Sequence, residues 1–330
     1  GRVVSGAGDI NGDGYDDIMI GSPAADPNEQ TNAGEVYVIF GQSGVYPTEF
    51  DLSSLDGTSG FVVHGSQPYD NFGASLSSIG DFNGDGYDDI VIAAPSADPD
   101  NKTAAGNTYL VFGKEGDYDA VLELSNLDGT TGFQLSGHQG LDSSGRSVAG
   151  AGDINGDGYA DLIIGAPGAD PNNTKSAGQT YVIFGTDETL PGTMQLSDLD
   201  GFNGFIINGI DSYDYSGRTV SSAGDIDGDG YDDLIIGAYG ADPRGNSNAG
   251  ETYVVMGRDF SGNSTVIDAL STSNIDSFPL NVSRGPLSNR LLVYLGEPSL
   301  AIPIVSRNPT LHRQGNGSDL VRPRFENTFG

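Results

Sequence analysis

The chain has 330 residues, including 51 Gly and 16 Pro but no Trp or Cys, and its formal net charge is −32. This Gly content excludes a mainly helical protein, because Gly inside a helix costs about 1 kcal/mol relative to Ala, and the lack of Cys excludes disulfides. The negative charge argues against nucleic acid as a partner, and no apolar segment is long enough for direct membrane insertion.

The acidic charge belongs to one part of the chain. Residues 1–257 contain 40 acidic and 7 basic residues, whereas residues 258–330 contain 6 and 7. The first part should therefore attract cations, and its sequence needs a local explanation for so many carboxylates.

An 11-residue segment recurs four times at a constant spacing. It reads GDINGDGYDDI from Gly8, GDFNGDGYDDI from Gly80, GDINGDGYADL from Gly152 and GDIDGDGYDDL from Gly224, so the period is 72 residues. A second segment keeps the same register, as YVIFG or a close variant from Tyr37, Tyr109, Tyr181 and Tyr253. A fixed period of this length indicates a repeat architecture.

Each unit is predicted to contain four short strands, A to D. For strands A, B and C the third unit supplies residues 146–152, 161–166 and 179–184, and an equivalent of strand D lies at residues 132–136. Tight Gly-rich turns favour an antiparallel meander, and apolar runs without clean alternation indicate sheets covered on both faces. We therefore expect an all-β protein, a β-propeller of four-stranded antiparallel blades that is partial or a fragment. A stacked solenoid and separate sandwiches are the competing architectures.

The turn after strand A has the composition of a calcium loop, Asp-x-Asn/Asp-Gly-Asp-Gly-Tyr-x-Asp, at residues 9–17, 81–89, 153–161 and 225–233. Ca²⁺ takes six to eight oxygen ligands, and a curled chain directs oxygens from alternate positions toward one point. Positions one, three, five and nine would supply side-chain oxygens, and the Tyr at position seven would supply its backbone carbonyl. The four predicted sites are Asp9, Asn11, Asp13, Tyr15 and Asp17; Asp81, Asn83, Asp85, Tyr87 and Asp89; Asp153, Asn155, Asp157, Tyr159 and Asp161; and Asp225, Asp227, Asp229, Tyr231 and Asp233.

The four copies favour ligand chemistry over general acidity. Position nine is always Asp, and position three changes only between Asn and Asp, whereas position eight becomes Ala160 once and is therefore not expected to be a ligand. An EF-hand would need Glu at position twelve, where this chain has Ile. The alternative is a simple hairpin turn, which would need fewer acidic groups in fixed phase.

These residues resemble the FG-GAP repeats of the integrin alpha-subunit N-terminal propeller. The second unit shows the pattern most fully, with Phe72-Gly73, the metal loop and Ala94-Pro95, whereas the fourth has Tyr239 in place of the Pro. The resemblance covers residues 1–257 and implies a propeller with calcium in the hairpins between strands A and B. It also implies ligand binding, and not catalysis.

The rest of the chain departs from the repeat. We expect a degenerate fifth blade or an unrelated segment at residues 258–307, and a disordered tail at residues 308–330.

Two further sets of residues recur in phase. Arg2, Arg146 and Arg218 form one set, and Asp70, Asp142 and Asp214 form the other, for which we expect a structural ion pair or hydrogen bond within each blade. The loops between strands B and C and between strands D and A vary in sequence, and some carry aromatic residues. One interpretation is that these loops bind a protein or glycan ligand; the other is that their sequences drift because neither the fold nor a ligand constrains them.

The sequence thus predicts a secreted or cell-surface module for adhesion or ligand binding, with four bound Ca²⁺ ions and no enzymatic activity. The alternative function is an accessory or catalytic propeller of a polysaccharide-degrading enzyme. A single active site would need a set of acid and base residues that is not repeated, and every notable carboxylate here is repeated.

Overall fold

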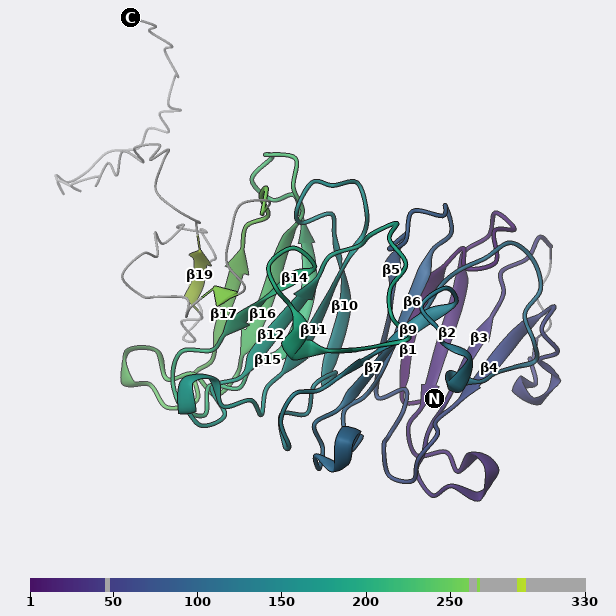
Figure 1. The fold of residues 1–330 in the computed structure, drawn as a ribbon, viewed down its shortest axis with the longest axis horizontal. Coiled ribbons are helices and arrows are strands. Elements are labelled where there is room, and N and C mark those ends of the chain that lie inside the picture. The colour runs from purple at the N-terminus through teal and green to yellow at the C-terminus, as the bar shows by residue number, and fades with distance from the viewer. Residues whose placement is uncertain (45–47, 261–265, 268–289, 295–330) are drawn as a thin grey trace, which may run out of the picture. The chain divides into compact units, whose positions relative to one another are not determined.

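Each 72-residue unit folds into one sheet, because short apolar runs alternate with turns rich in Gly, Asn and Asp that reverse the chain. The computed structural model describes residues 1–44, 48–260, 266–267 and 290–294. The four sheets follow one another in chain order, from the purple strands to the green ones in Figure 1. We call each sheet a blade and number the blades one to four.

The blades share one order of strands, with a further strand on the outer edge of the first three. Blade one contains β1 (Val3–Gly8), β2 (Asp17–Ser22), β3 (Glu35–Ile39), β4 (Gly60–His64) and β8 (Val121–Leu122). Blade two contains β5 (Ser75–Gly80), β6 (Asp89–Ala94), β7 (Asn107–Val111), β9 (Gly132–Ser136) and β13 (Thr193–Gln195). Blade three contains β10 (Ser147–Gly152), β11 (Asp161–Ala166), β12 (Gln179–Ile183), β14 (Gly204–Asn208) and β18 (Val266–Ile267). Blade four contains β15 (Ser216–Gly224), β16 (Asp233–Ala238), β17 (Glu251–Val255) and β19 (Arg290–Tyr294).

The predicted fold class is confirmed. Strands A to D of blades one to three pair antiparallel in chain order, and the strands predicted in the third unit end within one residue of β10, β11 and β12. No α-helix occurs among the residues that the structure describes, and the fold is consistent with a partial β-propeller. Blade four differs in its last strand, since β19 runs parallel to β17.

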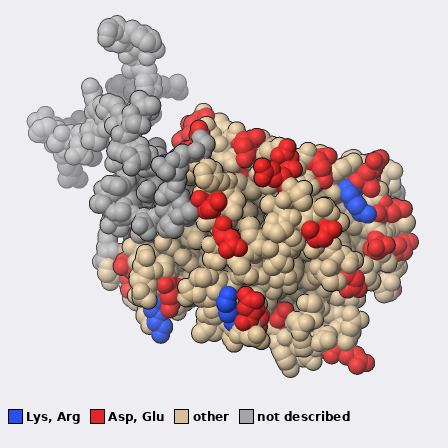
Figure 2. Space-filling view, viewed as in Figure 1, with Lys and Arg blue, Asp and Glu red and all other residues tan. Residues whose placement is uncertain are grey.

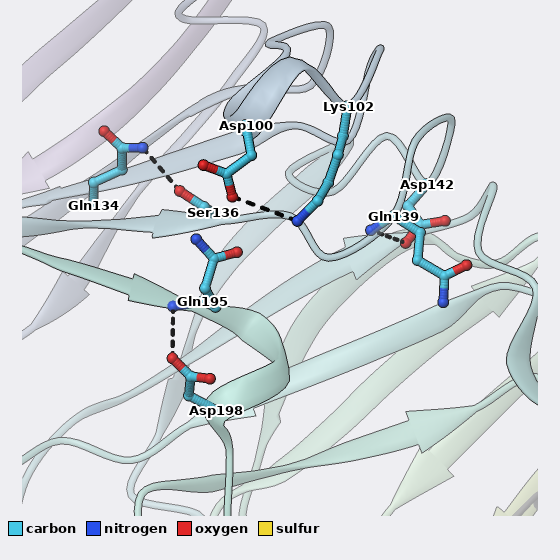
Figure 3. A network of polar contacts seen from close by, with 8 residues as sticks. All are labelled: Asp100, Lys102, Gln134, Ser136, Gln139, Asp142, Gln195 and Asp198. Atoms are coloured by element: carbon cyan, nitrogen blue, oxygen red, sulfur yellow. Dashed lines mark hydrogen bonds and ion pairs between the residues drawn. The ribbon is translucent and has the colours of Figure 1, made fainter.

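The connection between strands C and D crosses to the preceding blade, which the sequence did not indicate. The connection in blade two supplies β8, which pairs in parallel with β4 of blade one, and the connection in blade three supplies β13, which pairs with β9 of blade two. Figure 3 shows polar contacts on these two strands. Gln195, at the end of β13, donates its backbone N–H to Asp198, and on β9 the side chain of Gln134 donates to that of Ser136. Each blade is therefore joined to its predecessor at the outer edge.

The loops contain short 3-10 helices and no longer ones among the described residues. Those between strands B and C begin at a Pro, whose fixed φ suits the first helical position. These helices are η1 (Pro27–Glu29), η3 (Pro99–Asn101), η5 (Pro171–Asn173) and η7 (Pro243–Gly245). Those between strands C and D are η2 (Leu52–Ser54), η4 (Leu124–Asn126) and η6 (Leu196–Asp198).

The hydrophobic core is divided among the spaces between neighbouring blades. Met19, Val36 and Val38 of blade one pack against Ile90 and Ile92 of blade two, and equivalent clusters join blades two and three and blades three and four. The innermost strands β1, β5, β10 and β15 contact one another in turn. Apolar residues point alternately to the two neighbouring blades, so both faces of blades two and three are buried.

Blade one has one face that no described residue covers. Val4 and Ile18 are 73% and 50% exposed there, whereas Leu76 and Ile90, one repeat later, are 5% and 0% exposed. The same sequence pattern therefore gives a face that is buried in blade two, where blade one packs against it, and exposed in blade one among the described residues.

The C-terminal predictions lie mostly outside the described residues. Of the predicted fifth blade or unrelated segment at residues 258–307, the structure describes only residues 258–260, 266–267 and 290–294. The predicted tail at residues 308–330 lies outside the described residues altogether, as does the whole of a separate unit at Glu297–Gly330. Among the described residues no helix is long and apolar enough to cross a membrane.

Candidate metal centre

The four candidate loops lie at the same end of their blades, each between strands A and B. Gly12 and Gly14 have φ of +70° and +89°, a region that residues with a Cβ adopt only at a cost. The loop therefore turns tightly enough for its alternate side chains to face inward.

The side chains at positions one, three and five organise each loop. Asp9 accepts hydrogen bonds from the backbone N–H groups of Asp13 and Gly14, at 3.0 and 2.9 Å. Asp13 in turn accepts from the backbone of Tyr15 at 2.9 Å, and its other carboxylate oxygen accepts from the side chain of Asn11. The bonds from positions five and six to position one recur in the loops that begin at Asp81, Asp153 and Asp225. The side chains at positions one, three and five therefore lie beside one another in each loop, and their role as metal ligands stays a prediction.

The fourth loop has three carboxylates at these positions. Oxygens of Asp225, Asp227 and Asp229 all lie within 4.8 Å of one another, and all three side chains are exposed. Burial raises the pKa of Asp227, and the neighbouring charge of Asp229 raises it further. A divalent cation would offset this repulsion, so the chemistry of the residues fits calcium.

The carboxylate at position nine has a structural role that sequence reasoning missed. Asp17 is buried, and its two oxygens accept hydrogen bonds from the backbone of Ile10 at 3.0 Å and of Gly41 at 2.7 Å. Equivalent bonds are formed by Asp89, Asp161 and Asp233. This carboxylate ties the loop to the end of strand C, which explains its presence in every copy whether or not it also binds metal.

Burial also changes the acidity of this carboxylate. It raises the pKa of Asp17 to about 6, of Asp89 to about 7 and of Asp161 to about 8, in each case against the opposing effect of the two backbone donors. The carboxylates at positions five and one add to the increase. A cation bound in the loop would act in the opposite direction and favour the charged form.

Consecutive loops contact each other across blades through positions seven and eight. The carboxylate of Asp88 accepts the backbone N–H of Asp9 at 2.9 Å, and the carboxylate of Asp232 accepts that of Asp153 at 2.9 Å. A Cβ on Gly8, whose φ is +67°, would lie 2.1 Å from Asp88, so this position must be Gly. Position eight, for which Ala160 predicts no ligand role, thus forms a contact between blades that the sequence did not indicate.

The Tyr at position seven strengthens the contact between loops. The ring of Tyr87 lies over Gly12 of the preceding loop, where a Cβ would approach the ring to 2.3 Å, and Tyr159 and Tyr231 lie in the same way over Gly84 and Gly156. The Gly at position four thus serves the packing of the next blade as well as the turn. The backbone carbonyl of this Tyr remains a predicted ligand.

Comparison with known proteins supports the repeat assignment. A family model of the FG-GAP repeat matches residues 1–39, 72–111, 144–183 and 216–255, so one match falls in each 72-residue unit. The chain therefore carries four FG-GAP repeats.

Its relatives include integrin alpha subunits and a phospholipase D. The chain is 33% identical over 164 residues to integrin alpha-5 of Xenopus laevis, covering 50% of this chain and 14% of that protein. It is 34% identical over 177 residues to phosphatidylinositol-glycan-specific phospholipase D of Bos taurus, covering 53% of this chain and 19% of that protein. With the Dictyostelium discoideum phospholipase of the same name it shares 27% identity over 285 residues, 83% of this chain and 26% of the relative. The chain thus spans about a quarter or less of these relatives.

Proposed function

We propose that this chain is a calcium-binding FG-GAP module that acts outside the cell and binds a protein or glycan ligand without catalysis. The observation that carries the calcium assignment is the cluster of Asp225, Asp227 and Asp229, whose carboxylate oxygens lie within 4.8 Å of one another. Four Ca²⁺ ions, one in each loop, would offset part of the −32 charge. Their main effect would be to hold each loop against the backbone of its neighbour.

The extracellular location follows from the affinity expected of such sites. Dissociation constants of protein calcium sites range from about 10⁻⁹ to 10⁻³ M, and the weaker sites are filled only where calcium is abundant. Such sites would be filled by extracellular calcium and would rarely be filled in the cytosol. The acidic surface in Figure 2, with many red patches and few blue ones, is consistent with a soluble protein that does not bind nucleic acid.

The alternative is an accessory or catalytic propeller within an enzyme. The phospholipase D relatives keep an enzymatic context open, although the chain spans only 19% of the bovine protein, so the match does not assign that activity to this segment. The raised carboxylate pKa values recur by repeat, as at Asp89 and Asp161, which favours a structural cause over one active site. A screen for hydrolysis of polysaccharides and phospholipids would distinguish an enzyme from a binding module.

The test of calcium binding is thermal unfolding of the 330-residue chain in calcium and in EDTA, with bound metal counted by native mass spectrometry. We expect up to four ions, and a melting temperature at least about 5 °C higher in calcium, because each filled site adds about 2.7 kcal/mol at one hundred times its Kd. Single variants Asp13→Ala, Asp85→Ala, Asp157→Ala and Asp229→Ala should each remove one ion, whereas the exposed control Glu188→Ala should remove none. The proposal would be refuted by a folded protein that binds no metal and has the same melting temperature in calcium and in EDTA.

A further inference from the structure

Three arginines meet near the start of the innermost strands, away from the calcium loops. Arg2, Arg146 and Arg218 occupy the same place in blades one, three and four, and Ala74 stands there in blade two. The prediction for these arginines and the in-phase aspartates was an ion pair or a hydrogen bond within each blade. No ion pair joins the two sets among the described residues, where the salt bridges are His64–Glu35 and Lys102–Asp100. The second of these is drawn in Figure 3.

The aspartates are occupied differently. Asp142 accepts the backbone N–H of Gln139 at 3.2 Å in its own loop, as Figure 3 shows, and Asp214 accepts that of Asp211 at 3.3 Å. Burial lowers the pKa of Arg146, and the charges of Arg218 and Arg2 lower it further. Among the described residues no carboxylate lies within ion-pair distance of Arg146, Arg218 or Arg2.

A hollow of about 400 Å³ adjoins two of these arginines. Its lining includes Arg146 and Arg218 together with Leu141, Tyr215 and Tyr239. Tyr215 and Tyr239 stack with ring centroids 5.3 Å apart, and the guanidinium carbon of Arg218 lies 5.6 Å from the centre of the Tyr239 ring. The volume is within the usual range for small-molecule sites.

Two residues that line the hollow depart from the repeat. Tyr239 replaces the Pro found at positions 23, 95 and 167, and Tyr215 replaces Asn71 and Ser143. The side chain of Tyr239 is 55% exposed although it is aromatic. Residues required by the fold recur in every unit, so a cluster of departures beside arginines that form no ion pair among the described residues points to a ligand specific to this part of the molecule.

We propose that this hollow binds an acidic sugar unit, with its carboxylate at the guanidinium groups of Arg146 and Arg218 and its ring against the exposed part of the Tyr239 side chain. The proposal rests on the proposed function and names the class of ligand. Arginine binds carboxylates through paired N–H donors, and an exposed aromatic face accommodates the apolar side of a sugar ring. An acidic peptide fits less well, because the adjoining loops carry Asp98 beside Asp70 and Asp170 beside Asp142, and successive carboxylates would face more negative charge than a ligand with one.

The test uses saturation-transfer NMR on the 330-residue chain in calcium, with methyl β-D-glucuronide as the probe. The matched neutral probe is methyl β-D-glucoside, which differs only in lacking the carboxylate. We expect saturable binding of the glucuronide, at least ten-fold weaker binding of the glucoside, and weaker binding of the glucuronide at higher salt.

Variants separate the hollow from the rest of the surface. Arg146→Ala and Arg218→Ala should each weaken glucuronide binding at least ten-fold, and Arg146→Lys should weaken it less. Tyr239→Pro restores the residue found in the other repeats and should weaken the binding of both sugars. Lys102→Ala, which removes a positive charge on another loop, should change nothing. Calcium counts and melting temperatures should be unaltered in all of these, so a failure of calcium binding would be seen separately.

Three results would overturn the proposal. They are the absence of saturable glucuronide binding, equal binding of the two sugars, and undiminished binding in the Arg146→Ala/Arg218→Ala double variant. Tighter binding of a glutamate-rich peptide that depends on the same arginines would assign the site to an acidic protein segment instead.

Discussion

At the scale of single residues, the buried aspartates of the loops between strands D and A lower the free energy of unfolding by an amount that depends on pH. Burial raises the pKa of Asp70 to about 6 from 3.8, and the charge of Asp98 adds to the increase. Asp142 and Asp214 are raised to about 6 in the same way. Because the folded protein holds these protons more tightly than the unfolded chain, the contribution of these three groups to stability is fully present below about pH 4 and is lost as the pH rises through about 6.

Asp70→Asn tests this directly. The amide keeps the shape of the side chain but cannot ionise, so the variant should gain about 1 to 2 kcal/mol over the parent above pH 6, after allowance for solvent screening, and little at pH 4. The measurement is chemical denaturation at several pH values in constant calcium. The exposed control Asp100→Asn should leave the pH profile unchanged, and an Asp70→Asn profile parallel to that of the parent would show that Asp70 is not the cause.

At the scale of elements, the contact between consecutive loops is the feature that the sequence hides. The strands and loops could be predicted because they depend on neighbours within one 72-residue unit, as β10 to β12 show. The hydrogen bond from Asp9 to Asp88 joins residues 79 positions apart, and the sequence of neither segment indicates which residue it contacts. The crossing strands β8 and β13 were missed for the same reason, since they pair with the preceding unit.

The chain contains a natural control for this contact. Ala160 keeps the backbone bond to Asp81 at 3.0 Å but lacks the carboxylate that Asp88 and Asp232 supply at the other two junctions. Ala160→Asp should add the missing bond to the backbone N–H of Asp81 and stabilise the protein by about 1 kcal/mol in calcium, and Asp88→Ala should cost about 1 to 2 kcal/mol. The measurement is the free energy of unfolding in urea. If Ala160→Asp proved destabilising in saturating calcium, the carboxylate at position eight would not stabilise the contact between blades.

At the scale of the whole molecule, the blades depend on one another, because each buries its faces only against its neighbours. The three clusters of buried residues each draw on two consecutive blades, and the outer edges are joined by the crossing strands. The sequence repeats almost without change, so it predicts the same core residues in every unit. It cannot show which blade faces are buried, because the burial of a face depends on whether another blade packs against it and not on the residues of that face.

The pair Ile18 and Ile90 measures this dependence, since the two residues occupy the same place in blades one and two but are 50% and 0% exposed. Ile90→Ala leaves a cavity between blades and should cost about 2 to 5 kcal/mol, whereas Ile18→Ala removes a side chain already half in water and should cost less than about 1 kcal/mol. Urea denaturation of the two variants at low protein concentration gives the comparison. Equal losses would mean that the face of blade one is covered in solution, and sedimentation at increasing concentration would then show whether a second copy of the chain covers it.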